Sequence, residues 1–89
     1  MKIGVAMPTT EDQRIDATPS YSYIRDYARQ AEAAGFDSIW VYDHLLFRHA
    51  DQPATRGVWE AWTIMTALAA ATDRVEVGAL VLCMPFRNP

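Results

Sequence analysis

Apolar, β-branched residues gather in three short segments of the chain, at positions 3–7, 38–42 and 75–83. Turn-forming residues bound each segment, as is typical of β-strands. The first two segments begin about 35 residues apart and the last two about 37, which is the size of one βα unit. The stretches between them carry apolar residues at helical spacing. The pattern therefore predicts the element order β-α-β-α-β.

The first helix is expected to begin at residue 19 or 21 and to end at residue 34. Its apolar stripe comprises Ile24, Tyr27, Ala28, Ala31 and Ala34. Thr18, Pro19 and Ser20 supply a cap and a first-turn proline at its start. Gly35 supplies a left-handed stop at its end, because glycine adopts that conformation without a steric penalty.

The second helix is expected over residues 58–71. The residues predicted to face inward are Val58, Ala61, Trp62, Met65, Leu68 and Ala69. Glu60 falls in the first turn of this helix, where a carboxylate interacts favourably with the helix dipole. That interaction explains Glu60 adequately, and a catalytic role stays a minor alternative.

Strands that alternate with helices predict an α/β fold with a parallel sheet and right-handed crossovers. A doubly wound sheet and a βα-barrel both satisfy this order. The two strand-to-helix loops are long, polar and free of a glycine-rich phosphate fingerprint, which favours the barrel. We therefore expect the first three βα units of a (β/α)8 TIM barrel, with strand order 1-2-3 and the barrel incomplete.

Strand order 1-2-3 would place both helices on one face of the sheet and leave the other face bare. Alternate residues along Ile39/Val41 and along Val77/Ala79/Val81 would then lack packing partners. A bare apolar face favours association, so we expect a homo-oligomer or another contact through this face. The chain ends where a third helix would begin, which suggests a truncated domain, the amino-terminal part of something longer.

Composition narrows the class of protein further. The 89 residues fit one small domain, of which 51% are hydrophobic and 21% charged. A formal net charge of −3 gives no electrostatic footprint for nucleic acid or anionic lipid. The chain lacks an apolar run of the roughly 18–20 residues that a membrane span needs, and Pro8 interrupts the amino terminus too early for a signal peptide. We expect a cytoplasmic protein that binds neither nucleic acid nor membranes.

Asp43 and His44 directly follow the second predicted strand, at the end of the sheet that carries the active site in a barrel. Histidine can both take and give a proton near neutral pH. Asp43 could instead bond to backbone amides of the following loop. From position alone, a turn aspartate and a partly exposed histidine are the favoured interpretation.

Other candidates are weaker. A metal site would need more ligands than His44 and His49, which lie five residues apart in a loop.

Leu45, Leu46 and Phe47 could fold back onto the rim of the barrel or form the wall of an apolar pocket. Cys83 is the single cysteine, which excludes an internal disulfide and fits a reducing compartment. We expect it to be a small buried residue or to line the pocket.

Three blocks of the sequence are informative together: WVYDHLLFR, EAWTIMTALAAAT and VGALVLCMPFRNP. In their order and spacing they resemble the bacterial luciferase-like flavin- and F420-dependent oxidoreductase family. The resemblance implies a TIM barrel and either coenzyme F420 or FMN as cofactor. It also implies that His44 lies beside the ring of that cofactor and acts as a base or hydrogen-bonding partner, with Asp43 nearby.

The resemblance extends to the end of the third strand. Related proteins often carry a non-proline cis peptide or a bulge there, and the pattern puts it at Leu80–Val81. Residues Ala79, Leu80 and Val81 would then support the ring from behind. Arg87 and Asn88 could reach a cofactor phosphate or tie down the rim, and the structural role is preferred.

The resulting hypothesis is F420-dependent hydride transfer or FMN-dependent monooxygenation of a small organic substrate. DHLLFR and PFRNP favour the F420 branch slightly. The alternative is a non-catalytic truncated or split-gene fragment that needs further chain, or a partner, to bind cofactor.

Overall fold

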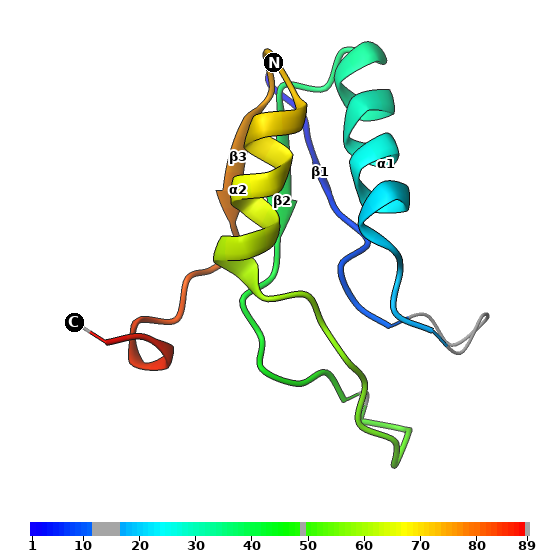
Figure 1. Ribbon diagram of the computed structural model, residues 1–89, viewed down its shortest axis with the longest axis vertical. Helices are drawn as coiled ribbons and strands as arrows, with labels where there is room; N and C mark the ends of the chain where they lie inside the picture. Colours follow the sequence, from blue (N-terminus) through cyan, green and yellow to red (C-terminus); the bar gives the residue numbers. More distant parts are fainter. Residues whose placement is uncertain (12–16, 49, 89) are drawn as a thin grey trace.

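The computed structural model describes residues 1–11, 17–48 and 50–88. Within these residues, three parallel strands lie in the order β1-β2-β3, with bounds β1 Gly4–Ala6, β2 Ser38–Val41 and β3 Glu76–Ala79. The strands alternate with helices α1 and α2 (Figure 1). The predicted α/β order and the strand order 1-2-3 are confirmed, and the barrel is not closed. Within the described ranges, no helix is long and apolar enough to cross a membrane.

Helix α1 spans Tyr21–Ala33. The Ser20 side chain accepts a hydrogen bond from the Tyr23 amide at 3.2 Å, so Ser20 is the N-cap and Pro19 lies before the helix, not in its first turn. Gly35 has a φ of 96°, which confirms the left-handed stop. The buried face of the helix consists of Ile24, Ala28 and Ala31, whereas Tyr27 and Ala34 of the predicted stripe are exposed.

Helix α2 spans Ala61–Ala71 and begins three residues later than predicted. Val58 instead forms an isolated antiparallel bridge with Thr10, so it does not define the buried face of the helix. That face consists of Ala61, Ile64 and Leu68. The prediction that Trp62 and Ala69 face inward is wrong: both are exposed, and Ile64 was missed.

Strand β3 is much shorter than the predicted segment 75–83. Its pairing with β2 ends at Val41 and Ala79, because β2 itself ends there. The Leu80–Val81 peptide bond that follows is cis, as the resemblance implied. A short 3-10 helix, η1 (Met84–Phe86), lies close to the end of the described residues.

The core lies between the helices and one face of the sheet. Ile39 and Val41 are fully buried on this face, and Val77 and Ala79 pack against them. The expectation that these residues and Val81 lack packing partners is therefore wrong for all of them except Val81, which is 69% exposed. The uncovered face carries Trp40 instead, 37% exposed, with its ring against Gly78. A Cβ at Gly78 would come within 2.7 Å of the Trp40 ring, so only glycine lets the indole lie flat there.

Candidate functional site at the carboxyl edge of the sheet

The carboxyl ends of β2 and β3 lie side by side. Val41 pairs with Ala79 in the last register position, and the Leu80 amide donates a hydrogen bond to the Val41 carbonyl at 2.8 Å. The segment with Asp43 and His44 and the segment that begins with Leu80 therefore leave the sheet at the same edge. In a βα-barrel this edge faces the active site.

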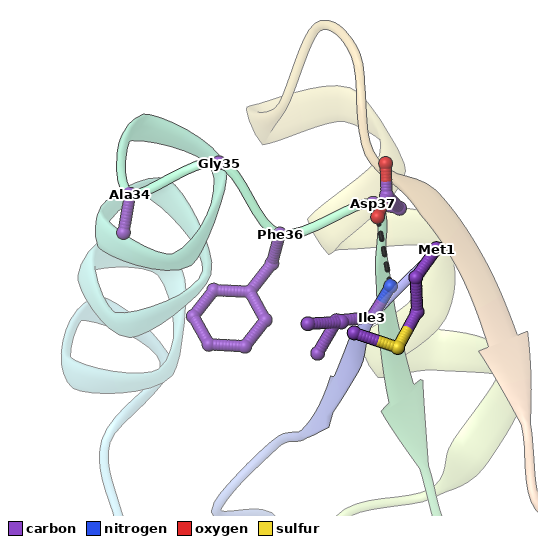
Figure 2. Close-up of a pocket in the computed structure, with 6 residues that line it drawn as sticks. All are labelled: Met1, Ile3, Ala34, Gly35, Phe36 and Asp37. Carbon is purple, nitrogen blue, oxygen red and sulfur yellow. Dashed lines mark hydrogen bonds between the residues drawn. The ribbon is translucent and has the colours of Figure 1, made fainter.

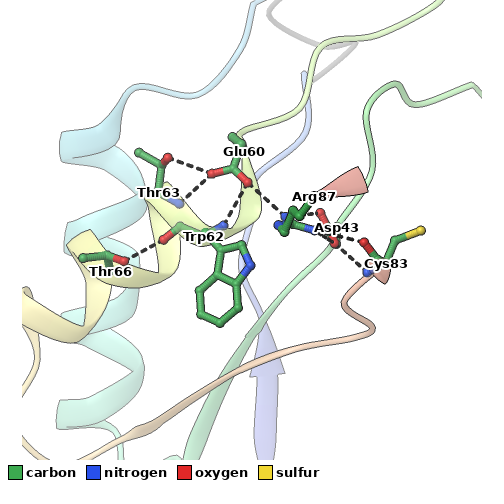
Figure 3. Close-up of polar contacts among 7 residues, drawn as sticks. All are labelled: Asp43, Glu60, Trp62, Thr63, Thr66, Cys83 and Arg87. Atoms are coloured by element: carbon green, nitrogen blue, oxygen red, sulfur yellow. Dashed lines mark hydrogen bonds and ion pairs between the residues drawn. The ribbon is translucent and has the colours of Figure 1, made fainter. Parts of the chain in front are cut away.

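Asp43 is a buried carboxylate held by groups from beyond β3 (Figure 3). The Arg87 guanidinium binds both of its oxygens, with Nη1 at 2.5 Å from Oδ2 and Nη2 at 2.8 Å from Oδ1. The Cys83 amide donates to Oδ2 at 2.7 Å. The hydrogen bonds from Arg87 and Cys83 lower the pKa of Asp43, so this carboxyl stays ionised near neutral pH. The amide that it binds belongs to Cys83 and not to its own following loop.

Glu60 is the N-cap of α2, one position before the first turn to which it was assigned. Its carboxylate accepts hydrogen bonds from the Thr63 hydroxyl and amide, both at 2.7 Å, and from the Trp62 amide at 3.3 Å. These bonds, with a contact from Arg87, lower the pKa of Glu60 to about 2. Glu60 therefore stays an anion at the start of the helix, where the dipole also favours negative charge.

Arg87 connects these two carboxylates. Its Nη2 lies 2.8 Å from Asp43 and 3.0 Å from Glu60, and its Nη1 also donates to the Cys83 carbonyl at 3.2 Å. Two carboxylates raise the pKa of the guanidinium, Asp43 more than Glu60. We call Asp43, Glu60, Cys83 and Arg87 the Arg87 clamp. The preferred structural interpretation of Arg87, a tie across the rim, agrees with these contacts.

His44 lies outside the clamp although it is the next residue after Asp43. Its side chain is exposed, whereas that of Asp43 is buried. The imidazole contacts Phe47 edge-on at a centroid distance of 5.6 Å and Tyr42 at 6.0 Å. The two neighbours therefore have different environments: a fixed anion bound on both oxygens, and an accessible imidazole beside two aromatic rings.

Exposed apolar side chains lie on both segments that leave the sheet at this edge. Leu45 and Leu46 are 69% and 67% exposed, so they do not fold back onto the rim. Leu80 and Val81, after β3, are 60% and 69% exposed. Cys83 is half-buried and is a free thiol. The edge thus combines an exposed apolar surface with few polar groups, which is the composition of a cofactor pocket wall.

The sequence analysis missed the pairing of Asp43 with Arg87. A signal for it was present, because carboxyl ends of adjacent parallel strands meet at one edge and these residues carry opposite charges after two such strands. Within the described ranges no group of three or more metal-ligating side chains occurs, and His49 lies outside those ranges.

A depression of about 190 Å³ lies at the opposite edge of the sheet (Figure 2). It is lined by Met1, Ile3, Ala34, Gly35, Phe36 and Asp37. The Ile3 amide donates to the Asp37 carboxylate at 2.8 Å, which joins the start of β1 to the start of β2. The depression is remote from His44, and its polar groups hold the strands together.

Comparisons with known proteins agree on one family. The family model described as luciferase-like monooxygenase matches residues 1–89. The chain is 42% identical over 69 residues to an F420-dependent glucose-6-phosphate dehydrogenase from Kineococcus radiotolerans, covering 74% of the chain and 19% of the relative. It is 46% identical over 66 residues to a protein of the same name from Amycolatopsis mediterranei, covering 72% and 19%. The chain thus spans about a fifth of the length of the curated relatives it matches.

Proposed function

The chain belongs to the luciferase-like monooxygenase family, and we propose that it is the amino-terminal segment of an F420-dependent oxidoreductase. Two relatives with this cofactor in their names support F420 over FMN. The observation that carries the proposal is the exposed His44 at the same edge of the sheet as the exposed apolar residues that follow β3.

The residues at this edge suit the ring of a deazaflavin. Such a ring needs apolar contact on its faces and a few polar groups at its rim. Leu80 and Val81 offer exposed apolar surface, and Ala79 lies directly before them on β3. Ala79, Leu80 and Val81 would support the ring from behind.

Asp43 and His44 take different roles in this proposal. When bound, the deazaflavin supplies hydride transfer. His44 holds or accepts the accompanying proton, because its imidazole is accessible and histidine exchanges protons near neutral pH. Asp43 is a poor base because its pKa is lowered by Arg87, so it serves as a fixed anionic acceptor at the rim.

The proposal does not specify the substrate. Both relatives are named glucose-6-phosphate dehydrogenases, which makes glucose 6-phosphate the first compound to test. FMN-dependent monooxygenation of a small organic molecule is the second candidate function, favoured by the description of the family.

Equilibrium titration of the full-length protein with F420 and, separately, with FMN tests the proposal. We expect F420 to bind with a saturable change in its fluorescence and FMN to bind more weakly. Tighter binding of FMN would transfer the proposal to the monooxygenase branch. Binding of neither cofactor would refute both and would favour the non-catalytic alternative.

A further inference from the structure

Arg87 uses its donors on groups of the protein itself. Guanidinium carries five N–H bonds, four of them on Nη1 and Nη2. Nη1 donates to Asp43 Oδ2 and to the Cys83 carbonyl, and Nη2 donates to Asp43 Oδ1 and to Glu60 Oε1. All four terminal N–H bonds therefore have a partner within the clamp.

The charge of the clamp also disfavours an anionic ligand at Arg87. Two carboxylates face one guanidinium, so the cluster carries a formal charge of −1. Displacement of Asp43 by a phosphate would leave a buried anion without its partner. Displacement of Glu60 would instead bring the phosphate beside the Asp43 carboxylate, which carries charge of the same sign. Arg87 is thus poorly suited to hold a cofactor phosphate, and another role must explain its position.

The clamp joins three segments that are distant in the sequence. Asp43 follows β2, Glu60 begins α2, and the Cys83 backbone lies beyond β3 on the segment that starts with Leu80 (Figure 3). Asp43 immediately precedes His44. The distance between His44 and the apolar residues after β3 therefore depends on how firmly Asp43 is held against Cys83 and Arg87.

We propose that Arg87 is a positioning residue, which sets His44 and residues 80–83 in the relative arrangement that cofactor binding requires. The inference rests on the proposed function and adds a residue that acts without touching the cofactor. The fork geometry is essential to this role, because one planar group bonds both Asp43 oxygens while it reaches Glu60. Lysine is a point charge and cannot reproduce that pattern.

Arg74 provides a matched control at the opposite edge of the sheet. Its Nη2 donates to the Glu32 carbonyl at 2.9 Å and to the Phe36 carbonyl at 2.8 Å, so it also ties separate segments together. Arg74 lies before β3 and has no part in the clamp. Substitution of either arginine by methionine keeps much of the apolar stem and removes the charge and the donors.

The test compares Arg87→Met, Arg87→Lys and Arg74→Met in the full-length protein. Hydrogen exchange is measured without cofactor, and the F420 dissociation constant is measured well below each thermal midpoint. We expect Arg87→Met to accelerate exchange at the Cys83 amide and to weaken F420 binding on the order of tenfold or more. Arg87→Lys should recover little of the binding, and Arg74→Met should bind F420 as the unmodified protein does.

A purely structural role for Arg87 predicts a different result. Its methionine variant would then melt earlier but bind F420 within about twofold of the unmodified protein, and that result would overturn the inference while leaving the proposed function intact. If Arg87→Met does not fold, Arg87→Lys decides in its place, because lysine keeps the charge but cannot bond both Asp43 oxygens at once. F420 affinity of Arg87→Lys equal to that of the unmodified protein would overturn the inference. Failure of the unmodified protein to bind F420 would overturn the proposed function and the inference together.

Discussion

Two carboxylates tie segments of this chain together at opposite edges of the sheet, and they do so with different partners. At the amino edge, Glu32 accepts hydrogen bonds from three successive backbone amides, those of Asp73, Arg74 and Val75, at 2.6–3.2 Å. At the carboxyl edge, Asp43 accepts one backbone amide and is otherwise held by the Arg87 side chain. One carboxylate holds a turn of the main chain, and the other depends on a side chain 44 residues away.

This difference assigns different roles to the two edges. Glu32, near the end of α1, fixes the turn that leads from α2 into β3, which helps to set the start of that strand. Asp43 fixes the segments that leave the sheet beside His44. In βα-barrels the amino edge serves stability and the carboxyl edge carries the chemistry. Under the proposed function, the two carboxylates follow that division within three strands.

The largest effect on function is expected from Asp43→Asn. The amide keeps the shape of the side chain but loses the charge, and its NH2 group faces a donor of Arg87 or the Cys83 amide. We expect F420 affinity and turnover each to fall on the order of tenfold or more. Fluorescence titration and steady-state kinetics measure the two quantities. Unchanged F420 affinity and turnover in Asp43→Asn would show that function does not depend on the Asp43 carboxylate.

Glu32→Ala should affect stability and spare function. The substitution leaves the amides of Asp73, Arg74 and Val75 without their acceptor, and water can replace only part of these bonds. We expect the thermal midpoint to fall by a few degrees, while F420 affinity at a temperature well below that midpoint stays within about twofold. Glu32→Gln, which keeps one acceptor oxygen, is the control and should lose less. A loss of F420 affinity in Glu32→Ala would show that the amino edge also controls the site.

Low pH should decrease the stability that the carboxylates at both edges provide, and this effect is expected to be smaller than those of the substitutions. The pKa of Glu60 is lowered from its ordinary 4.5 to about 2, first by the hydrogen bonds from Thr63, and the pKa values of Glu32 and Asp43 are lowered too. A folded-state pKa below the unfolded value adds stability above the unfolded pKa, and this stability is lost as the pH falls through the folded pKa. The thermal midpoint should therefore decrease between about pH 4.5 and about pH 2. In Glu60→Gln the thermal midpoint should decrease less over this pH range. An equally steep decrease in this variant would show that Glu60 does not contribute to it.

The order of elements could be predicted because each depends on residues close in sequence. The apolar segments predicted the strands, and Gly35 predicted the end of α1. The sequence blocks that include Asp43 and His44 indicated the family. The start of α2 was misplaced because Val58 pairs with Thr10, a contact that helical periodicity does not reveal. Trp62 was consequently assigned to the wrong face.

Both carboxylate ties were missed for a related reason. Glu32 lies on the polar side of a helix stripe, where a solvated carboxylate is the ordinary expectation. Its three amide partners follow only from the way in which the α2–β3 turn packs beside α1. Arg87 was recognised as a possible tie but its partners were not. Contacts of this kind depend on which segments the fold brings together, and a single sequence reveals them only after the strand order is known.

One F420 titration of the full-length protein tests the division between the edges most directly. The unmodified protein, Asp43→Asn and Glu32→Ala are titrated under the same conditions, with the fraction folded confirmed by circular dichroism. We predict saturable binding to the unmodified protein, nearly equal binding to Glu32→Ala, and binding to Asp43→Asn weaker on the order of tenfold. Equal losses in both variants, or a greater loss in Glu32→Ala, would contradict the account.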